Sequence, residues 1–247
     1  MFCKKVMVIG AGTMGSGIAQ VFVTHGCEVI LNDIKQEFID GGVKKIDKSL
    51  TKLVAKEKMS QADKDAAMAR VTGFVEITEE NMKGVDLVVE AAIEDMNIKA
   101  QIFKNLDEKC PAHTILASNT SSLPITKIAA ATKRPKQVIG MHFFNPAPVM
   151  KLIEIINGIA TSDETFEKVK TASEELGKSP VKVSDFPGFV GNRVVIPMIN
   201  EAIQALMEGV ASKEDIDSVC KLGFNHPMGP LALSDLIGND VVQIGRA

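Results

Sequence analysis

The pattern of apolar and polar positions divides the chain into two parts. In the first part, short apolar runs rich in Val and Ile predict buried strands over residues 5–9, 29–31, 86–92, 114–117 and 138–144. Between them, apolar residues recur at helical spacing, as at Ile98, Ile102 and Leu106. This alternation predicts a Rossmann-type α/β fold, with a doubly wound and mainly parallel sheet.

The pattern changes after Lys151. Two more strands are expected over residues 151–156 and 181–184, with a helix over 162–176 between them. Beyond Pro187 only helical patterns remain, over residues 188–207, 212–222 and 231–242. We therefore expect an α/β domain over residues 1–184 and a smaller all-α domain over residues 185–247.

Composition and charge exclude several classes of protein. The 247 residues carry 28 Lys and Arg against 31 Asp and Glu, a net charge of −3, and they include no Trp and no Tyr. The chain therefore lacks both the excess of basic residues and the Trp and Tyr stacking positions that would favour a nucleic-acid partner. The N-terminal apolar run is too short for a signal or membrane segment, and the four cysteines form no Cys-x-x-Cys pair. We expect a cytoplasmic protein with reduced thiols, no membrane association and no metal site.

A glycine-rich loop follows the first expected strand. Gly10, Ala11, Gly12, Thr13, Met14 and Gly15 fit G-x-G-x-x-G and open a helix. In this context the first glycine permits a tight turn, the second admits a pyrophosphate, and the third allows close helix–strand packing. The loop predicts a dinucleotide site, although a purely structural turn is the alternative.

An acidic residue ends the second expected strand. Asp33 lies 18 residues after Gly15 (33 − 15), where a carboxylate can accept hydrogen bonds from an adenosine ribose. Its charge would repel a 2′-phosphate and so favours NAD over NADP. The alternative is that Asp33 is a turn residue.

A basic stripe occupies the helical pattern around residue 50. Residues 44–58 hold six lysines against Asp47 and Glu57, a local charge of +4 (6 − 2). On a helix, Lys48, Lys52 and Lys56 would share one face beside Ser49. The stripe is either a solvated surface or a binding site for a phosphate-rich ligand.

One histidine has a predicted acidic partner. If residues 140–154 form a hairpin centred on Pro148, then His142 and Glu154 lie opposite each other, since each is six residues from the centre. A carboxylate behind an imidazole fixes its tautomer and makes it a better general base. A buried histidine satisfied by a structural acid is the alternative.

Two further groups of polar residues lie at positions where they could contact a ligand. Asn192 falls within an apolar helical stripe, where an amide needs a partner. It either faces a cleft or satisfies local backbone. The run from Ser118 to Ser122 follows a strand at the carboxyl edge of the sheet, where a serine can contact substrate or cap the next helix.

These residues together resemble the short-chain L-3-hydroxyacyl-CoA dehydrogenase family. The matching stretches run in family order and cover residues 10–15, 87–92, 117–123, 142–154, 187–193 and 226–230. Gly191 departs from the aliphatic residue that is common there. Relatives also continue through further helices, so the second domain is expected to be truncated.

The resemblance implies a role for each site residue. His142 would be the general base and acid, Glu154 would orient it, and Ser121 and Asn192 would hydrogen-bond the reacting oxygen or acyl group. Glu94, Lys99 and Asn145 match further NAD contacts, while Ser49 and Lys56 match contacts to coenzyme A. Lys52 joins that substrate-binding set through the lysine stripe.

The expected function follows from these roles. It is reversible NAD-dependent interconversion of (S)-3-hydroxybutyryl-CoA and acetoacetyl-CoA. The resemblance also implies that the enzyme is a homodimer. The alternatives are a dehydrogenase of a free 3-hydroxy acid and a truncated NAD-binding protein without turnover.

Overall fold

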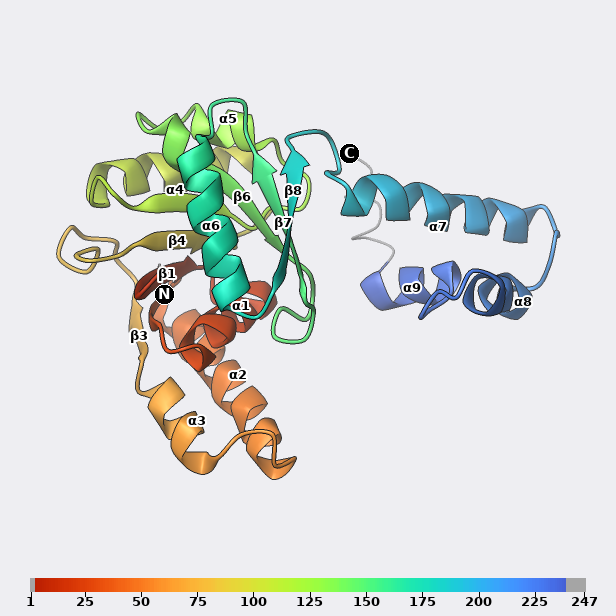
Figure 1. Ribbon diagram of the computed structural model, residues 1–247, viewed down its shortest axis with the longest axis horizontal. Helices are drawn as coiled ribbons and strands as arrows, with labels where there is room; N and C mark the ends of the chain where they lie inside the picture. The colour runs from red at the N-terminus through yellow and green to blue at the C-terminus, as the bar shows by residue number, and fades with distance from the viewer. Residues whose placement is uncertain (1–2, 239–247) are drawn as a thin grey trace. The chain divides into compact units, whose positions relative to one another are not determined.

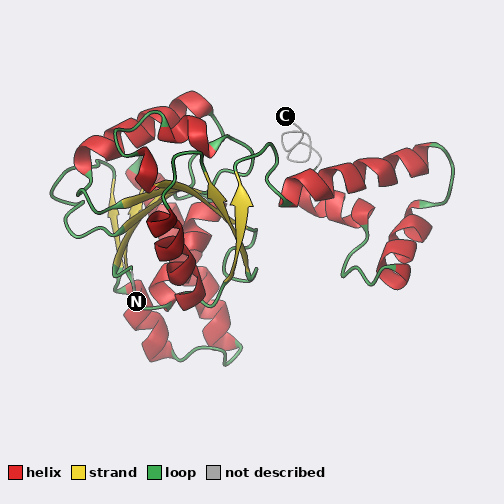
Figure 2. Ribbon diagram, turned by 45° about the horizontal axis from the view of Figure 1, so that its top comes forward, coloured by secondary structure: helices red, strands yellow, loops and turns green. Residues whose placement is uncertain are grey.

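The computed structural model describes residues 3–238, which form two compact units (Figure 1). The chain passes from the first unit to the second between Asp185 and Phe186. The first unit contains an eight-stranded sheet with helices on both faces, and the second is helical (Figure 2). Each unit is described by itself below.

The sheet of the first unit has the strand order β3-β2-β1-β4-β5-β6-β7-β8. The strands are β1 (Lys5–Ile9), β2 (Glu28–Asn32), β3 (Val71–Phe74), β4 (Leu87–Glu90), β5 (Ile115–Ser118), β6 (Val138–Phe143), β7 (Leu152–Asn157) and β8 (Ser179–Ser184). All neighbouring strands are parallel except β6 and β7, which are antiparallel. The carboxyl ends of β1, β2, β4, β5 and β6 therefore meet at one edge.

Helices pack on both faces of the sheet (Figure 2). The helices are α1 (Thr13–Thr24), α2 (Gln36–Ala55), α3 (Gln61–Met68), α4 (Met96–Lys109), α5 (Ile125–Ala129) and α6 (Asp163–Glu175), with a 3-10 turn at Pro135–Gln137. A core of Val, Ile, Leu and Phe side chains joins α1, α2 and α6 to one face. Helix α5 contacts both α4 and β6. Asp95 and Ser162 cap α4 and α6, so each helix begins where its sequence offers an acceptor for exposed N–H groups.

The second unit consists of α7 (Gly191–Met207), α8 (Lys213–Ser218), a π-helical turn (Val219–Gly223) and α9 (Pro230–Ile237). Helix α9 packs against both α7 and α8. Within residues 3–238, no helix is long and apolar enough to cross a membrane.

The expected fold class is confirmed, with differences in detail. The four-residue strand β3 was not predicted, because it alternates half-buried with exposed positions and contains Gly73. Helix α7 begins at Gly191 and not at Gly188, since Phe189 has a φ of 50° and lies in the preceding turn. The helical pattern predicted over residues 188–207 is therefore shorter at its start, and Phe189 lies outside the helix. Of the last predicted helix, residues 239–242 lie outside the described residues.

Candidate active site

The glycine loop between β1 and α1 has the geometry of a dinucleotide cradle. Gly10 has a φ of 95°, and a Cβ atom there would lie 2.5 Å from the carbonyl oxygen of Ala91. A Cβ atom on Gly15 would lie 1.7 Å from the carbonyl oxygen of Gly10, so only glycine fits at either position. A Cβ atom on Gly12, by contrast, would meet no atom within 4 Å. The space over Gly12, at the amino end of α1, fits the pyrophosphate of a dinucleotide.

Asp33 connects this loop to the end of β2. Its carboxylate accepts hydrogen bonds from the backbone N–H of Ala11 and of Ile34, each at 2.7 Å. A carboxylate has about four acceptor positions, so two protein donors leave capacity for ribose hydroxyls. The structure therefore brings Asp33 to the loop, as the sequence predicts.

His142 and Glu154 form a buried pair on β6 and β7. The antiparallel register places them directly opposite each other, which confirms the predicted pairing. His142 Nδ1 lies 2.8 Å from Glu154 Oε2, and both side chains are buried. Donation from Nδ1 to the carboxylate leaves Nε2 as the basic nitrogen of the neutral ring. The pair has the geometry of an oriented general base.

The segments beside His142 are held by side chains from other elements. The Phe144 ring lies 4.7 Å from the imidazole, centroid to centroid, and Asn119 accepts a hydrogen bond from the N–H of Phe143. Lys178 donates to the carbonyl oxygens of Ala147 and Met150 in the loop between β6 and β7. Asn145 is exposed at the start of this loop, where it can meet a ligand.

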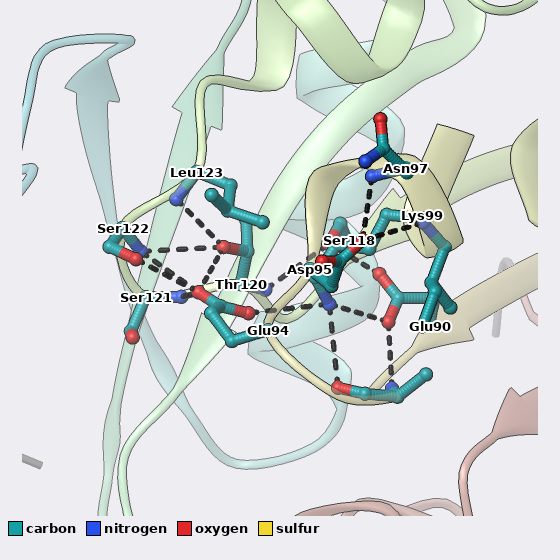
Figure 3. Close-up of polar contacts among 12 residues, drawn as sticks. Glu90, Glu94, Asp95, Asn97, Lys99, Ser118, Thr120, Ser121, Ser122 and Leu123 are labelled. Atoms are coloured by element: carbon teal, nitrogen blue, oxygen red, sulfur yellow. Dashed lines mark hydrogen bonds and ion pairs between the residues drawn. The ribbon is translucent and has the colours of Figure 1, made fainter. Parts of the chain in front are cut away.

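Glu94 organises the loop that carries Ser121 (Figure 3). One oxygen, Oε1, accepts hydrogen bonds from the Thr120 hydroxyl, from the N–H of Ser121 at 3.0 Å, and from the N–H and hydroxyl of Ser122. Burial by itself would raise the pKa of Glu94, but the Thr120 hydroxyl, the Lys99 ammonium and the serine donors together hold it below its usual value. Glu94 therefore stays anionic near neutral pH.

Lys99 lies behind Glu94. Its ammonium is 2.7 Å from Glu90 Oε1 and 3.4 Å from Glu94 Oε2, and its side chain is 1% exposed. Glu90 is fully buried and also accepts hydrogen bonds from the Ser118 hydroxyl and the N–H of Ala92. The Lys99 ammonium therefore points to these two carboxylates. It does not point to the open edge of the sheet, where a cofactor would lie.

The lysine stripe lies mostly on α2. Lys48 and Lys52 are exposed on this helix and Ser49 is half-buried, while Ile46 and Leu50 are buried on the opposite side. The helix ends at Ala55, so Lys56 is its C-cap residue. Within residues 3–238, the ammonium groups of these three lysines have no ion-pair partner, which leaves them available to an anion.

Asn192 belongs to the other unit. It is the second residue of α7 and is half-buried there. In the first unit, the structure gathers Gly10 to Gly15, Asp33, Glu94, Ser121, His142 and Glu154 on the connections and strand ends of one sheet. Among the residues that the structure describes, no group of three His, Cys, Asp or Glu side chains could hold a metal ion.

Three polar residues of this edge had no role in the sequence prediction. They are Glu90, Asn119 and Thr120, whose contacts join the ends of β4, β5 and β6. Glu90 carried one signal, since it is the only charged residue in the apolar run 87–92. A carboxylate inside a buried strand needs a partner, and that partner is Lys99.

A dinucleotide cradle, a ribose-facing carboxylate and an oriented histidine define the class of NAD-dependent dehydrogenases. The sequence profile of the 3-hydroxyacyl-CoA dehydrogenase NAD-binding domain matches residues 5–186, and that of the C-terminal domain of the same enzymes matches residues 188–246. The chain belongs to the 3-hydroxyacyl-CoA dehydrogenase family, and its cofactor is NAD.

Individual relatives are similar over most of their length. The 3-hydroxybutyryl-CoA dehydrogenase of Clostridioides difficile is 56% identical over 96% of this chain and 84% of the relative. The human mitochondrial hydroxyacyl-coenzyme A dehydrogenase is 45% identical over 97% of this chain and 78% of its own. The crystal structure of (S)-3-hydroxybutyryl-CoA dehydrogenase from Ralstonia eutropha superposes with a TM-score of 0.94 at 48% identity, covering 98% of this chain and 85% of that one.

Proposed function

We propose that this chain interconverts (S)-3-hydroxybutyryl-CoA and acetoacetyl-CoA with NAD(H). The observation that carries the proposal is the buried His142–Glu154 pair, with 2.8 Å between Nδ1 and Oε2, at the edge of the sheet that also holds the glycine loop. The named substrate of the C. difficile and R. eutropha relatives supports the four-carbon acyl group.

In the proposed reaction His142 handles the proton. Its Nε2 atom takes the proton of the 3-hydroxyl group during oxidation and returns it during reduction, while Glu154 holds the tautomer and stabilises the imidazolium that forms. The nicotinamide, when bound, supplies the hydride acceptor or donor. Ser121 and Asn192 are proposed to hydrogen-bond the reacting oxygen or acyl group, which positions C3 for transfer.

The remaining roles concern binding. Gly10, Ala11, Gly12, Thr13, Met14 and Gly15 would hold the pyrophosphate, and Asp33 the adenosine ribose. Glu94 and Asn145 would contact the nicotinamide half, with Lys99 acting on it through Glu94. Ser49, Lys52 and Lys56 would bind the phosphates of coenzyme A, because a cationic helix face suits a phosphate-rich ligand.

The roles of the two units, the oligomeric state and the cellular location are also proposals. The two units would act as an NAD-binding domain and a helical domain in a homodimer. A cytoplasmic location is supported by the cysteines, since none of the four forms a disulfide among the described residues and three of them are buried.

The test is NADH consumption with acetoacetyl-CoA, with NADPH and free acetoacetate as comparisons. We expect turnover with NADH and the thioester. His142→Ala should lower kcat by roughly 10³-fold while NADH binding is kept. A folded, NADH-binding wild-type chain that shows no turnover would overturn the enzyme proposal. Equal kcat/KM with free acetoacetate would indicate a dehydrogenase of free acids.

A further inference from the structure

Three charged side chains form a connected group at the end of β4, here called the Glu90–Lys99–Glu94 triad. Lys99 bridges the two carboxylates, at 2.7 Å from Glu90 and 3.4 Å from Glu94. Glu90 and Lys99 are buried, and the Glu94 side chain is 26% exposed. Two carboxylates and one ammonium give the triad a formal charge of −1.

The triad lies next to the glycine loop. The N–H of Ala91 donates to the carbonyl oxygen of Ile9 at 2.7 Å, and Ala91 limits the space at Gly10. If Asp33 binds the adenosine ribose at β2, the nicotinamide half of a dinucleotide would extend the other way, towards β4 and β5. The end of β4 would then lie beneath the nicotinamide half.

The register links the triad to the catalytic pair. Glu90 is opposite Ser118, and Ser118 is opposite Gly140, so these three residues form one row across β4, β5 and β6. His142 is two residues beyond Gly140, and side chains two apart on a strand share a face. Glu90 and His142 therefore project from the same face, close to the same edge of the sheet.

The two forms of the cofactor differ in charge. The nicotinamide ring is cationic when oxidised and neutral when reduced, and a nearby negative charge in a poorly hydrated site stabilises the cation. Glu94 makes the contacts to the loop, whereas Glu90 contributes charge from behind Lys99. With Glu90 neutral, the triad charge would be zero.

We propose that Glu90 is a specificity-determining residue, which keeps the triad at −1 and thereby favours binding of NAD⁺ relative to NADH. It acts through Lys99 and Glu94 and is a positioning residue, not a catalytic one. The inference rests on the proposed function, in that it requires NAD to bind at this edge of the sheet.

The first test is Glu90→Gln, which keeps the shape of the side chain and removes its charge. NADH binding is followed by NADH fluorescence, with little protein background because the chain lacks Trp and Tyr, and NAD⁺ binding by displacement of NADH. We expect the ratio Kd(NAD⁺)/Kd(NADH) to rise about three- to tenfold, as one unit charge at short range predicts. An unchanged ratio in a folded variant would overturn the proposal.

A compensating variant separates charge from structure. Glu90→Gln with Lys99→Met restores a triad charge of −1 without the ion pair, so the ratio should return to within about twofold of wild type. A purely structural role predicts no such return. Should Glu90→Gln not fold, Glu94→Gln provides the same test at a partly exposed position. Alone it changes the triad charge to zero, and combined with Lys99→Met it restores the charge of −1.

Two further variants serve as controls. Asp86→Asn makes the same change in charge just before β4, at the opposite end of that strand, and its amide oxygen can still accept from the N–H groups of Lys4 and Lys5. Ser118→Ala removes the hydrogen bond to Glu90 and the one accepted from the N–H of Thr120, without changing the triad charge. Both should leave the ratio unchanged. If the wild-type chain binds neither form of NAD, the proposed function fails. If it binds both forms and the ratio Kd(NAD⁺)/Kd(NADH) does not change in Glu90→Gln, only this inference fails.

Discussion

Glu154 lies directly across the antiparallel ladder from His142, with its Oε2 atom 2.8 Å from Nδ1. The ladder fixes both backbone positions, so the carboxylate is aligned with the imidazole before any ligand binds. This relationship makes Glu154 the residue that sets the tautomer of His142.

Glu154→Gln should therefore separate orientation from packing. The amide has nearly the same volume, but it carries no charge to stabilise the imidazolium, and we expect kcat to fall by roughly 10²- to 10³-fold. The Kd for NADH should stay within about twofold of wild type. Steady-state kinetics with acetoacetyl-CoA and NADH titration measure both quantities. A kcat within threefold of wild type would contradict the assigned role.

Asp33 should determine the choice between NADH and NADPH by its charge. Asp33→Asn keeps an oxygen that can accept from Ala11 N–H, as Asp33 Oδ2 does at 2.7 Å, but it removes the repulsion of a 2′-phosphate. We expect the ratio of kcat/KM for NADH over NADPH to fall about tenfold. Asp33→Ala also loses the loop contact and should raise the KM for both cofactors. Asn at position 33 with full preference for NADH would refute the charge argument.

The lysine face of α2 should distinguish thioester from free acid. Lys52→Ala and Lys56→Ala each remove one exposed cation, and we expect each to raise the KM for acetoacetyl-CoA about three- to tenfold, with more effect at low salt. Turnover of free acetoacetate, where measurable, should not change. Lys104→Ala, an exposed lysine on α4, is the matched control. Equal effects at Lys52 and Lys104 would argue against a coenzyme A site.

The sequence analysis predicted best those parts of the site whose residues lie close together in the chain or on neighbouring strands. The glycine loop, Asp33 and the His142–Glu154 pair each depend on residues within one or two neighbouring strands, and the structure brings them together as expected. The role of Glu90 depends on contacts with Ser118 and Lys99, 28 and 9 residues away, and no local pattern specifies both. Strand β3 was missed for a related reason, since an edge strand with half-exposed positions lacks a continuous apolar run.

Thiol reactivity should report the burial of the cysteines. Burial raises the pKa of the Cys27 thiol to about 11 and that of Cys110 to about 12, and it raises the pKa of Cys3 further. At pH 8 a thiol with a pKa near 11 is about one thousandth thiolate, and the thiolate is the reactive form. A native chain should therefore react at no more than one thiol, the half-buried Cys220, and a denatured chain at four. Rapid native labelling of Cys220→Ser would contradict this assignment.

The stability contributed by Glu94 should depend on pH. Its pKa in the folded chain is below the usual value despite burial, because Thr120, Lys99 and the serine donors stabilise the carboxylate. In the unfolded chain the pKa returns to the ordinary value of a glutamate. A lowered folded pKa means that the contribution is fully present above the unfolded pKa and is lost as pH falls through the folded one.

Glu94→Gln should consequently lower the free energy of unfolding by about 1 kcal/mol at pH 7, and the difference from wild type should shrink below about pH 4. Urea denaturation at pH 7, 5, 4 and 3 measures this difference. Glu174→Gln, at an exposed position on α6, should show no such trend and controls for the substitution itself. A wild-type advantage that stays constant from pH 7 to pH 3 would mean that the Glu94 charge does not stabilise the loop at Thr120 to Ser122, and that the loss comes instead from the different hydrogen-bonding geometry of the amide.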